Sequence, residues 1–147
     1  MSDARITFIQ PAHFARPRGY ANGALTTGGK TLYIGGQIGW QADQTFATDD
    51  FVAQFAQALD NVLAVLEAAG GQPTDIADMT VYVTDLDAYR HSGRALGEVW
   101  KQRLGRHYPA MALVGVAGLV HPRAQVEIQA VACLDVSVPV PDSASEK

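Results

Sequence analysis

Apolar residues between Asp50 and Gly70 recur at steps of three and four, and this stripe constrains the fold more than any other feature. The stripe comprises Phe51, Val52, Phe55, Leu59, Val62, Leu63 and Leu66. Such spacing predicts a helix whose apolar face packs on a sheet. Asp49 or Asp50 supplies the cap and Gly70 with Gly71 the stop. The remaining positions are expected to face water or another subunit, namely Gln54, Gln57, Asp60 and Glu67.

Segments typical of strands surround this helix. They cover residues 6–9, 23–27, 30–35, 79–83, 111–116 and 125–134. A second helix is expected to start at Asp85 or Asp87 and to end near Gly105, weakened by Gly93 and Gly97. Gly28 and Gly29 predict a hairpin turn between the second and third strands. The resulting order is βββαβαββ.

This order predicts a single α+β domain with one sheet and two helices packed on one face. The domain is expected to span residues 1–136, followed by a disordered tail over 137–147. The other face of the sheet receives no cover from this chain, so we expect association through it. In the last strand Glu127 and Gln129 lie on that uncovered side, together with apolar Val131.

Composition narrows the class of function. The formal net charge is −4 with scattered basic residues, which argues against binding to nucleic acid. No charged-then-apolar leader and no apolar run of about 18 residues is present, so neither export nor membrane insertion is indicated. One cysteine, Cys133, excludes an intrachain disulfide and fits a cytoplasmic protein.

Few residues offer chemistry by spacing alone. The histidines lack metal-ligand spacing, so no metal site is predicted, and His107 and His121 are interpreted as solvated loop residues. The glycines in Gly35-Gly36-Gln37 either form a bulge or let another backbone approach closely, or they contact a ligand, and the structural and ligand roles can hold together. Glu127 lies in an otherwise apolar strand, where its carboxylate either holds and activates water or simply faces solvent.

Several short motifs resemble one known family. They are Arg18-Gly19-Tyr20, Gly35-Gly36-Gln37-Ile38, Leu59-Asp60-Asn61-Val62, Ala68-Ala69-Gly70, Val83-Thr84-Asp85-Leu86, Pro109-Ala110 and Val126-Glu127-Ile128-Gln129-Ala130-Val131-Ala132. In this order, over about residues 6–135, the chain resembles the Rid family, also called YjgF-like. The resemblance implies a chorismate-mutase-like fold of the bacillus type and a homotrimer with clefts between subunits. It also implies hydrolysis of reactive enamines and imines to keto acids and ammonia, without a cofactor.

The resemblance carries over residue by residue. Tyr20 matches the family's pocket tyrosine, Gly36 and Gln37 its Gly-Gln strand end, and Glu127 the glutamate that positions water. Tyr20 and Glu127 are therefore the candidate catalytic residues.

Three positions depart from the deaminating members. Gly35 replaces a serine, Leu113 a cysteine, and Met111 the arginine that grips the substrate carboxylate. A methionine offers neither charge nor donors, so the usual substrate is not expected to bind, and an aromatic or amide-like ligand becomes plausible. Arg94 and Arg123 are the candidates to supply charge from another direction.

Three functions follow from these observations. The leading hypothesis is an enamine or imine deaminase that acts on a small metabolite between subunits. The alternative is a non-catalytic trimer that binds a small ligand or acts like a chaperone. An endoribonuclease, a label that some relatives carry, is disfavoured by the acidic charge.

Overall fold

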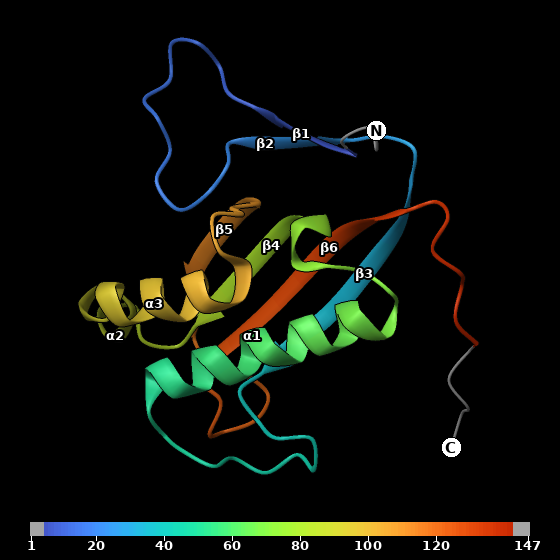
Figure 1. Ribbon diagram of the computed structural model, residues 1–147. Helices are drawn as coiled ribbons and strands as arrows, with labels where there is room; N and C mark the ends of the chain where they lie inside the picture. The colour runs from blue at the N-terminus through green and yellow to red at the C-terminus, as the bar shows by residue number, and fades with distance from the viewer. Residues whose placement is uncertain (1–4, 143–147) are drawn as a thin grey trace.

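Four strands form the central sheet of the protein, as seen in a computed structural model that describes residues 5–142. The strands are β3 (Gly29–Ile38), β4 (Ile76–Val83), β5 (Ala110–Gly115) and β6 (Val126–Asp135), and their order across the sheet is β3-β6-β4-β5. β4 and β5 run parallel, whereas β6 is antiparallel to both of its neighbours (Figure 1). The sheet is therefore mixed, and β3 and β5 are its edges.

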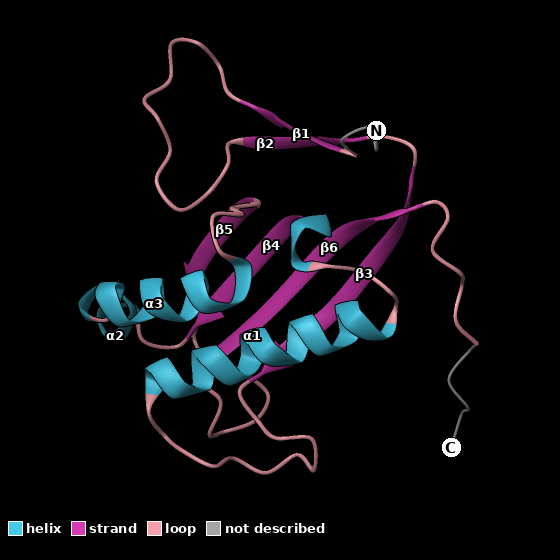
Figure 2. Cartoon of the chain, in the orientation of Figure 1, coloured by secondary structure: helices cyan, strands magenta, loops and turns pink. Residues whose placement is uncertain are grey.

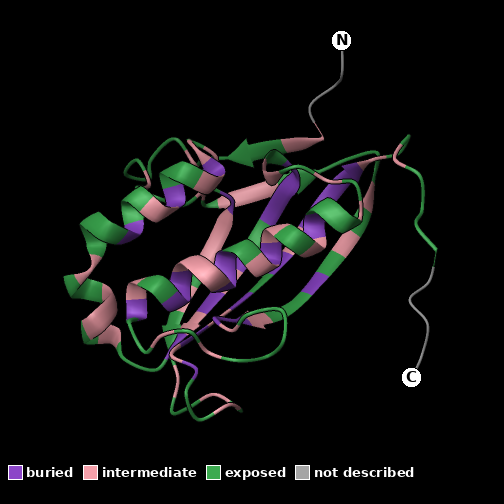
Figure 3. Cartoon of the chain, turned by 60° about the horizontal axis from the view of Figure 1, so that its bottom comes forward, coloured by how far each residue is buried: buried purple, intermediate pink, exposed green. Residues whose placement is uncertain are grey.

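The helices α1 (Phe51–Ala68), α2 (Leu86–His91) and α3 (Gly93–Leu104) lie on one face of this sheet (Figure 2). Asp50 caps α1, because its side chain accepts a hydrogen bond of 2.9 Å from the backbone N–H of Ala53. The apolar stripe of α1 turns toward the sheet, where it is buried against alternate residues of β6 (Figure 3). The predicted α+β fold with helices on one face is thus confirmed.

The second predicted helix is in fact two helices. The helix is interrupted at Ser92, whose backbone leaves the helical region with φ −106° and ψ 14°, and α3 begins at Gly93. A short 3₁₀ helix, η1 (Pro73–Asp75), connects α1 to β4.

The predicted hairpin at Gly28-Gly29 is wrong. β2 (Gly23–Thr26) pairs with β1 (Ile6–Ile9) in a separate two-stranded sheet, so not every strand joins one sheet. Only Gly28 takes a positive φ, 66°, and there the chain turns from β2 into β3, which pairs with β6 instead. Figure 1 shows the β1–β2 hairpin standing apart from the four-stranded sheet.

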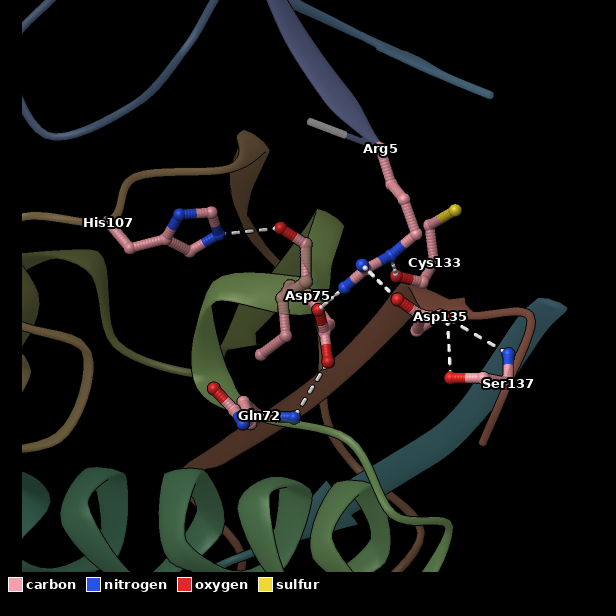
Figure 4. A network of polar contacts seen from close by, with 8 residues as sticks. Arg5, Gln72, Asp75, His107, Cys133, Asp135 and Ser137 are labelled. Atoms are coloured by element: carbon pink, nitrogen blue, oxygen red, sulfur yellow. Dashed lines mark hydrogen bonds and ion pairs between the residues drawn. The ribbon is translucent and has the colours of Figure 1, made fainter. Parts of the chain in front are cut away.

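A polar network fastens this hairpin to the rest of the fold (Figure 4). The Arg5 guanidinium forms an ion pair with Asp75 and donates to Asp135 at 3.3 Å and to the Cys133 carbonyl at 3.2 Å. Asp75 also accepts a 2.8 Å bond from the backbone N–H of Gln72. The start of β1 is thereby joined to η1 and to the end of β6.

Within residues 5–142 no helix covers the opposite face of the four-stranded sheet. Tyr33 on β3 is 78% exposed and Val114 on β5 is 41% exposed. The Tyr82 hydroxyl donates to Gln129 on this face at 3.0 Å. The face that the sequence leaves uncovered is thus bare in the single chain.

The described part of the expected tail, residues 137–142, follows the end of β6. Val138 donates a 3.0 Å backbone hydrogen bond to Asp135, while 143–147 lie outside the described residues. None of the helices described between residues 5 and 142 is both long and apolar enough to cross a membrane.

Candidate functional site

Glu127 and Gly36 meet at an irregularity between β3 and β6. Ile34 pairs with Ala130 and Gln37 pairs with Ile128, so β3 contains one extra residue at this point, a β-bulge. The carboxylate of Glu127 lies against Gly36, where a Cβ would stand 2.6 Å from Oε2 and 2.8 Å from Cδ. The predicted bulge is therefore present, and the glycine provides space for the side chain of Glu127 rather than for another backbone.

This carboxylate opens into a pocket of about 420 Å³, which we name the Glu127 pocket. Its lining consists of Gly36, Gln37, Ile38, Trp40, Val120, His121, Pro122 and Glu127. Glu127 is half-buried and, among the described residues, no side chain or backbone group forms a hydrogen bond or ion pair with its carboxylate. Both oxygens are left free for water or a ligand.

Asn61 and Gln54 of α1 hold the walls of the Glu127 pocket. The Asn61 amide donates to the carbonyls of Ile38 at 3.0 Å and Trp40 at 2.9 Å. Gln54 donates to the carbonyl of Arg123 at 3.0 Å and accepts from the backbone N–H of Gln125 at 2.9 Å. These bonds position the ends of two loops that meet at the pocket.

The position of Gln54 corrects a prediction. Its side chain is fully buried, at 0% exposure, although its place outside the apolar stripe had predicted contact with water or a partner. Burial is tolerated because both ends of the amide are hydrogen-bonded.

His121 is not the solvated residue that the sequence suggests. Its half-buried ring lies 4.7 Å from Phe46 and 5.9 Å from Trp40, centroid to centroid. The His121 Nδ1 accepts the backbone N–H of Arg123 at 3.1 Å, which in a neutral ring leaves the proton on Nε2.

His107 is likewise engaged. The His107 Nε2 lies 2.7 Å from the Ile76 carbonyl, and its ring lies 5.7 Å from that of Phe8. Both histidines therefore contribute to packing in the part of the chain described.

Met111 and Leu113 lie elsewhere in the single chain. They project from β5 toward the helices and line a second pocket of about 270 Å³, the Met111 pocket. Its other lining residues are Gly19, Phe55, Val81, Tyr89, Gly93, Leu96, Gly97, Trp100 and Tyr108. Within a single chain, Met111 and Leu113 therefore line a different pocket from Glu127.

Tyr20 lines a third pocket, of about 300 Å³, whose wall consists mostly of β1 and the loop between β1 and β2. The tyrosine is 43% exposed. Tyr108 borders this pocket as well as the Met111 pocket, so the two hollows are neighbours. Tyr20 and Met111 are accordingly close in the fold, and neither lines the Glu127 pocket.

The two alternative cations border none of these three pockets. Arg123 pairs with Asp49 at 2.9 Å, and its guanidinium carbon lies 5.4 Å from the centroid of the Phe46 ring. Arg94 is exposed on α3.

No group of three or more metal-ligating side chains is found between residues 5 and 142.

Some residues of the Glu127 pocket could not be predicted from the sequence. Trp40, Val120 and Pro122 belong to irregular loops, whose paths depend on the bonds from Gln54 and Asn61. A polar residue beside an apolar stripe, as Gln54 is, gives only a weak indication that its side chain is buried and fixes a loop. Asn61 belongs to a motif that the resemblance picked out, but without an assigned role.

Comparison with known proteins identifies the family. The family model described as endoribonuclease L-PSP matches residues 13–134. Human 2-iminobutanoate/2-iminopropanoate deaminase is 35% identical over 105 residues, which cover 70% of this chain and 72% of that protein. A RutC family protein of Aquifex aeolicus is 34% identical over 69% of this chain and 78% of its own length.

Solved structures agree with this result. The crystal structure of YyfB from Yersinia pestis, a protein of unknown function in the conserved Rid family, superposes with a TM-score of 0.80 and 29% identity, covering 89% of this chain and all of that one. RidA from a Psychrobacter species gives a TM-score of 0.62 at 32% identity, covering 82% and 92%. The chain therefore belongs to the endoribonuclease L-PSP family, the family of Rid and YjgF proteins.

Proposed function

We propose that the protein hydrolyses the carbon–nitrogen bond of a small imine or enamine, with Glu127 as the residue that positions and activates water. The observation that carries this proposal is the Glu127 carboxylate, which is half-buried beside Gly36 and open to the pocket. Curated relatives named 2-iminobutanoate/2-iminopropanoate deaminase support deaminase-like activity in the family.

The proposed reaction balances without a cofactor. Glu127 takes a proton from water while the water oxygen bonds to the imine carbon, and the electron pair of the C=N bond moves to nitrogen. The proton then passes to that nitrogen. Glu127 next moves the hydroxyl proton of the carbinolamine to its nitrogen as the C–N bond breaks, so that ammonia leaves and a carbonyl remains. An enamine first gains a proton at carbon and loses one from nitrogen, which converts it to the imine.

The full site is proposed to form between copies of the chain. Tyr20 and Met111 border hollows separate from the Glu127 pocket, so a second copy is needed to bring them to the same ligand. The bare sheet face exposes the large side chains of Tyr33 and Val114, which such association would cover. A homotrimer is the expected assembly, and light scattering at micromolar concentration tests it; a folded monomer would contradict it.

The test of the activity uses imines generated in the reaction vessel. An amino-acid oxidase supplies 2-iminobutanoate and an amine oxidase supplies an uncharged imine, with semicarbazide as the competing trap. The native protein is expected to lower the yield of semicarbazone from at least one source. Glu127→Gln should reduce this effect by about 10²- to 10⁴-fold, the usual contribution of general acid–base catalysis.

Glu98→Gln on α3 is the matched control, because Glu98 is an exposed carboxylate that borders none of the three pockets. It should retain full activity. Equal activity of Glu127→Gln and the native protein would exclude the proposed role of Glu127. A native protein that accelerates hydrolysis of neither imine would exclude the enzymatic function and favour the non-catalytic alternative.

A further inference from the structure

The Met111 pocket differs in chemistry from the Glu127 pocket. It lies at edge strand β5, between the sheet and helices α2 and α3. Among the described residues that line it, none carries a charge. Burying an unpaired charge in such a place costs several kcal/mol, so the pocket disfavours an ionised group.

Two stacked aromatic rings form one wall of this pocket. The rings of Trp100 and Tyr108 stack with centroids 5.9 Å apart and planes inclined by only 3°. Trp100 donates its indole N–H to the carbonyl of His107 at 3.1 Å. That bond fixes the plane of the indole and leaves its only polar atom unavailable to a ligand. The indole therefore presents a flat, apolar face whose orientation is fixed.

Two glycines of α3 open the pocket. Gly93 and Gly97 are one helical turn apart and both border the hollow. A Cβ added at either position would meet nothing within 4 Å, and neither has a positive φ. Neither packing nor backbone conformation requires glycine here, although glycine inside a helix costs about 0.5–1 kcal/mol relative to alanine. The lost side chains leave space that larger residues would fill.

We propose that the Met111 pocket binds an uncharged aromatic ring of the ligand. Its volume of about 270 Å³ is ample for one ring, given that a dry protein cavity of about 150 Å³ can hold benzene. A ring there would pack against Trp100 and contact the polarisable Met111 sulfur, both favourable for an aromatic group. The corresponding substrate would be an imine or enamine with a neutral aromatic substituent. This identification of the substrate rests on the proposed function.

Binding of benzamide and benzoate to the full-length protein tests this inference without any turnover. The two probes share a ring and differ in charge. Nuclear magnetic resonance titration should show benzamide shifting the backbone amides of Gly97 and Met111 and the indole N–H of Trp100. Benzoate should bind at least tenfold more weakly. Equal binding of the two probes, or shifts confined to other residues, would overturn the inference.

Gly97→Leu fills the pocket from α3 and should weaken benzamide binding at least tenfold. Gly97→Ala is the conservative variant: it should keep the helix stable and reduce binding by a smaller factor. Ala95→Leu is the matched control, because Ala95 is exposed on the same helix and does not line the pocket. Benzamide binding that survives Gly97→Leu unchanged, or that falls equally in Ala95→Leu, would refute this site.

The two proposals fail separately. Glu127→Gln should bind benzamide as the native protein does, since Glu127 lines a different pocket. Benzamide binding that Gly97→Leu removes, in a protein that hydrolyses no imine, would support the aromatic pocket and overturn the proposed reaction. Imine hydrolysis without benzamide binding would overturn the aromatic pocket alone.

Discussion

The carboxylate of Glu127 occupies the space that a side chain at Gly36 would need. This relationship explains why Gly36 and Glu127 occur together at the bulge where β3 and β6 pair. The bulge turns β3 locally, and the missing Cβ allows the carboxylate to lie over the strand. The geometry can be tested through the glycine without touching the glutamate.

Gly36→Ala should reduce imine hydrolysis by about 10- to 100-fold while the protein remains folded. The added methyl would stand 2.6 Å from Oε2 of Glu127 and force the carboxylate to move, and a small misplacement of a catalytic group is costly. Because the end of a flexible side chain can move aside, the melting temperature should fall little. Activity and thermal unfolding of the same preparation are the measurements.

Gly35→Ala is the comparison, since its Cβ would meet nothing within 4 Å. The loss of activity in Gly35→Ala should be smaller than in Gly36→Ala. If the order is reversed, the contact between Gly36 and Glu127 does not determine the geometry of the site.

Asp75→Asn should destabilise the fold by about 2 kcal/mol, the usual value of a hydrogen bond to a charged group that is largely buried. Asp75 is 7% exposed, forms an ion pair with Arg5 and accepts the backbone N–H of Gln72 (Figure 4). Urea unfolding measures the change in free energy.

Asp87→Asn is the matched control for this substitution. Asp87 pairs with Arg90 at 3.5 Å, but its side chain is 79% exposed. An exposed pair of this kind contributes at most about 1 kcal/mol. Equal effects of the two substitutions would show that the Arg5 network does not fasten the hairpin.

Acid should weaken the fold in part through Asp135. The backbone N–H and hydroxyl of Ser137 hydrogen-bond to its carboxylate and hold its pKa below the ordinary value of 3.8, with smaller contributions from Arg5 and Lys30. A depressed folded-state pKa gives stability that is complete above the unfolded-state pKa and is lost as pH falls through the folded-state pKa. Asp135→Asn should therefore lower the melting temperature at pH 7 and change it less at pH 2.5. An equal change at both pH values would contradict this linkage.

Local patterns predicted the elements that depend on neighbouring residues. The stripe of α1 and the alternation of β4 and β6 gave correct elements because helix and strand periods are set by adjacent side chains. The positive φ of Gly28 was also foreseeable. Which strand β3 would join was not, because pairing with β6 depends on residues about 100 positions away in the sequence.

The candidate site likewise contains residues that the sequence could predict and residues that it could not. Glu127 stands out as a charge within an apolar strand, and Gly36 as part of a glycine pair. The sequence could not predict that Met111 and Glu127 line different pockets, because this depends on which side chains of β5 point toward the helices. Gln54 was misjudged because its partners, Thr48, Arg123 and Gln125, belong to loops without a periodic pattern.

The residue at Met111 should decide whether the protein accepts an acid. The native protein is expected to hydrolyse 2-iminobutanoate and 2-aminoacrylate poorly, because their carboxylate must leave water and no charged side chain lines the Met111 pocket among the described residues. Met111→Arg should raise the rate with these acids by about 30-fold to several-thousand-fold, the equivalent of 2–5 kcal/mol for one charged partner. The same variant should bind benzamide more weakly, since a guanidinium would replace the apolar wall. Ammonia release with each acid is the measurement.

Rapid hydrolysis of these acids by the native protein would mean that another cation binds their carboxylate. Arg94→Ala and Arg123→Ala then test the two candidate cations. If neither substitution lowers the activity, this account of ligand choice is refuted.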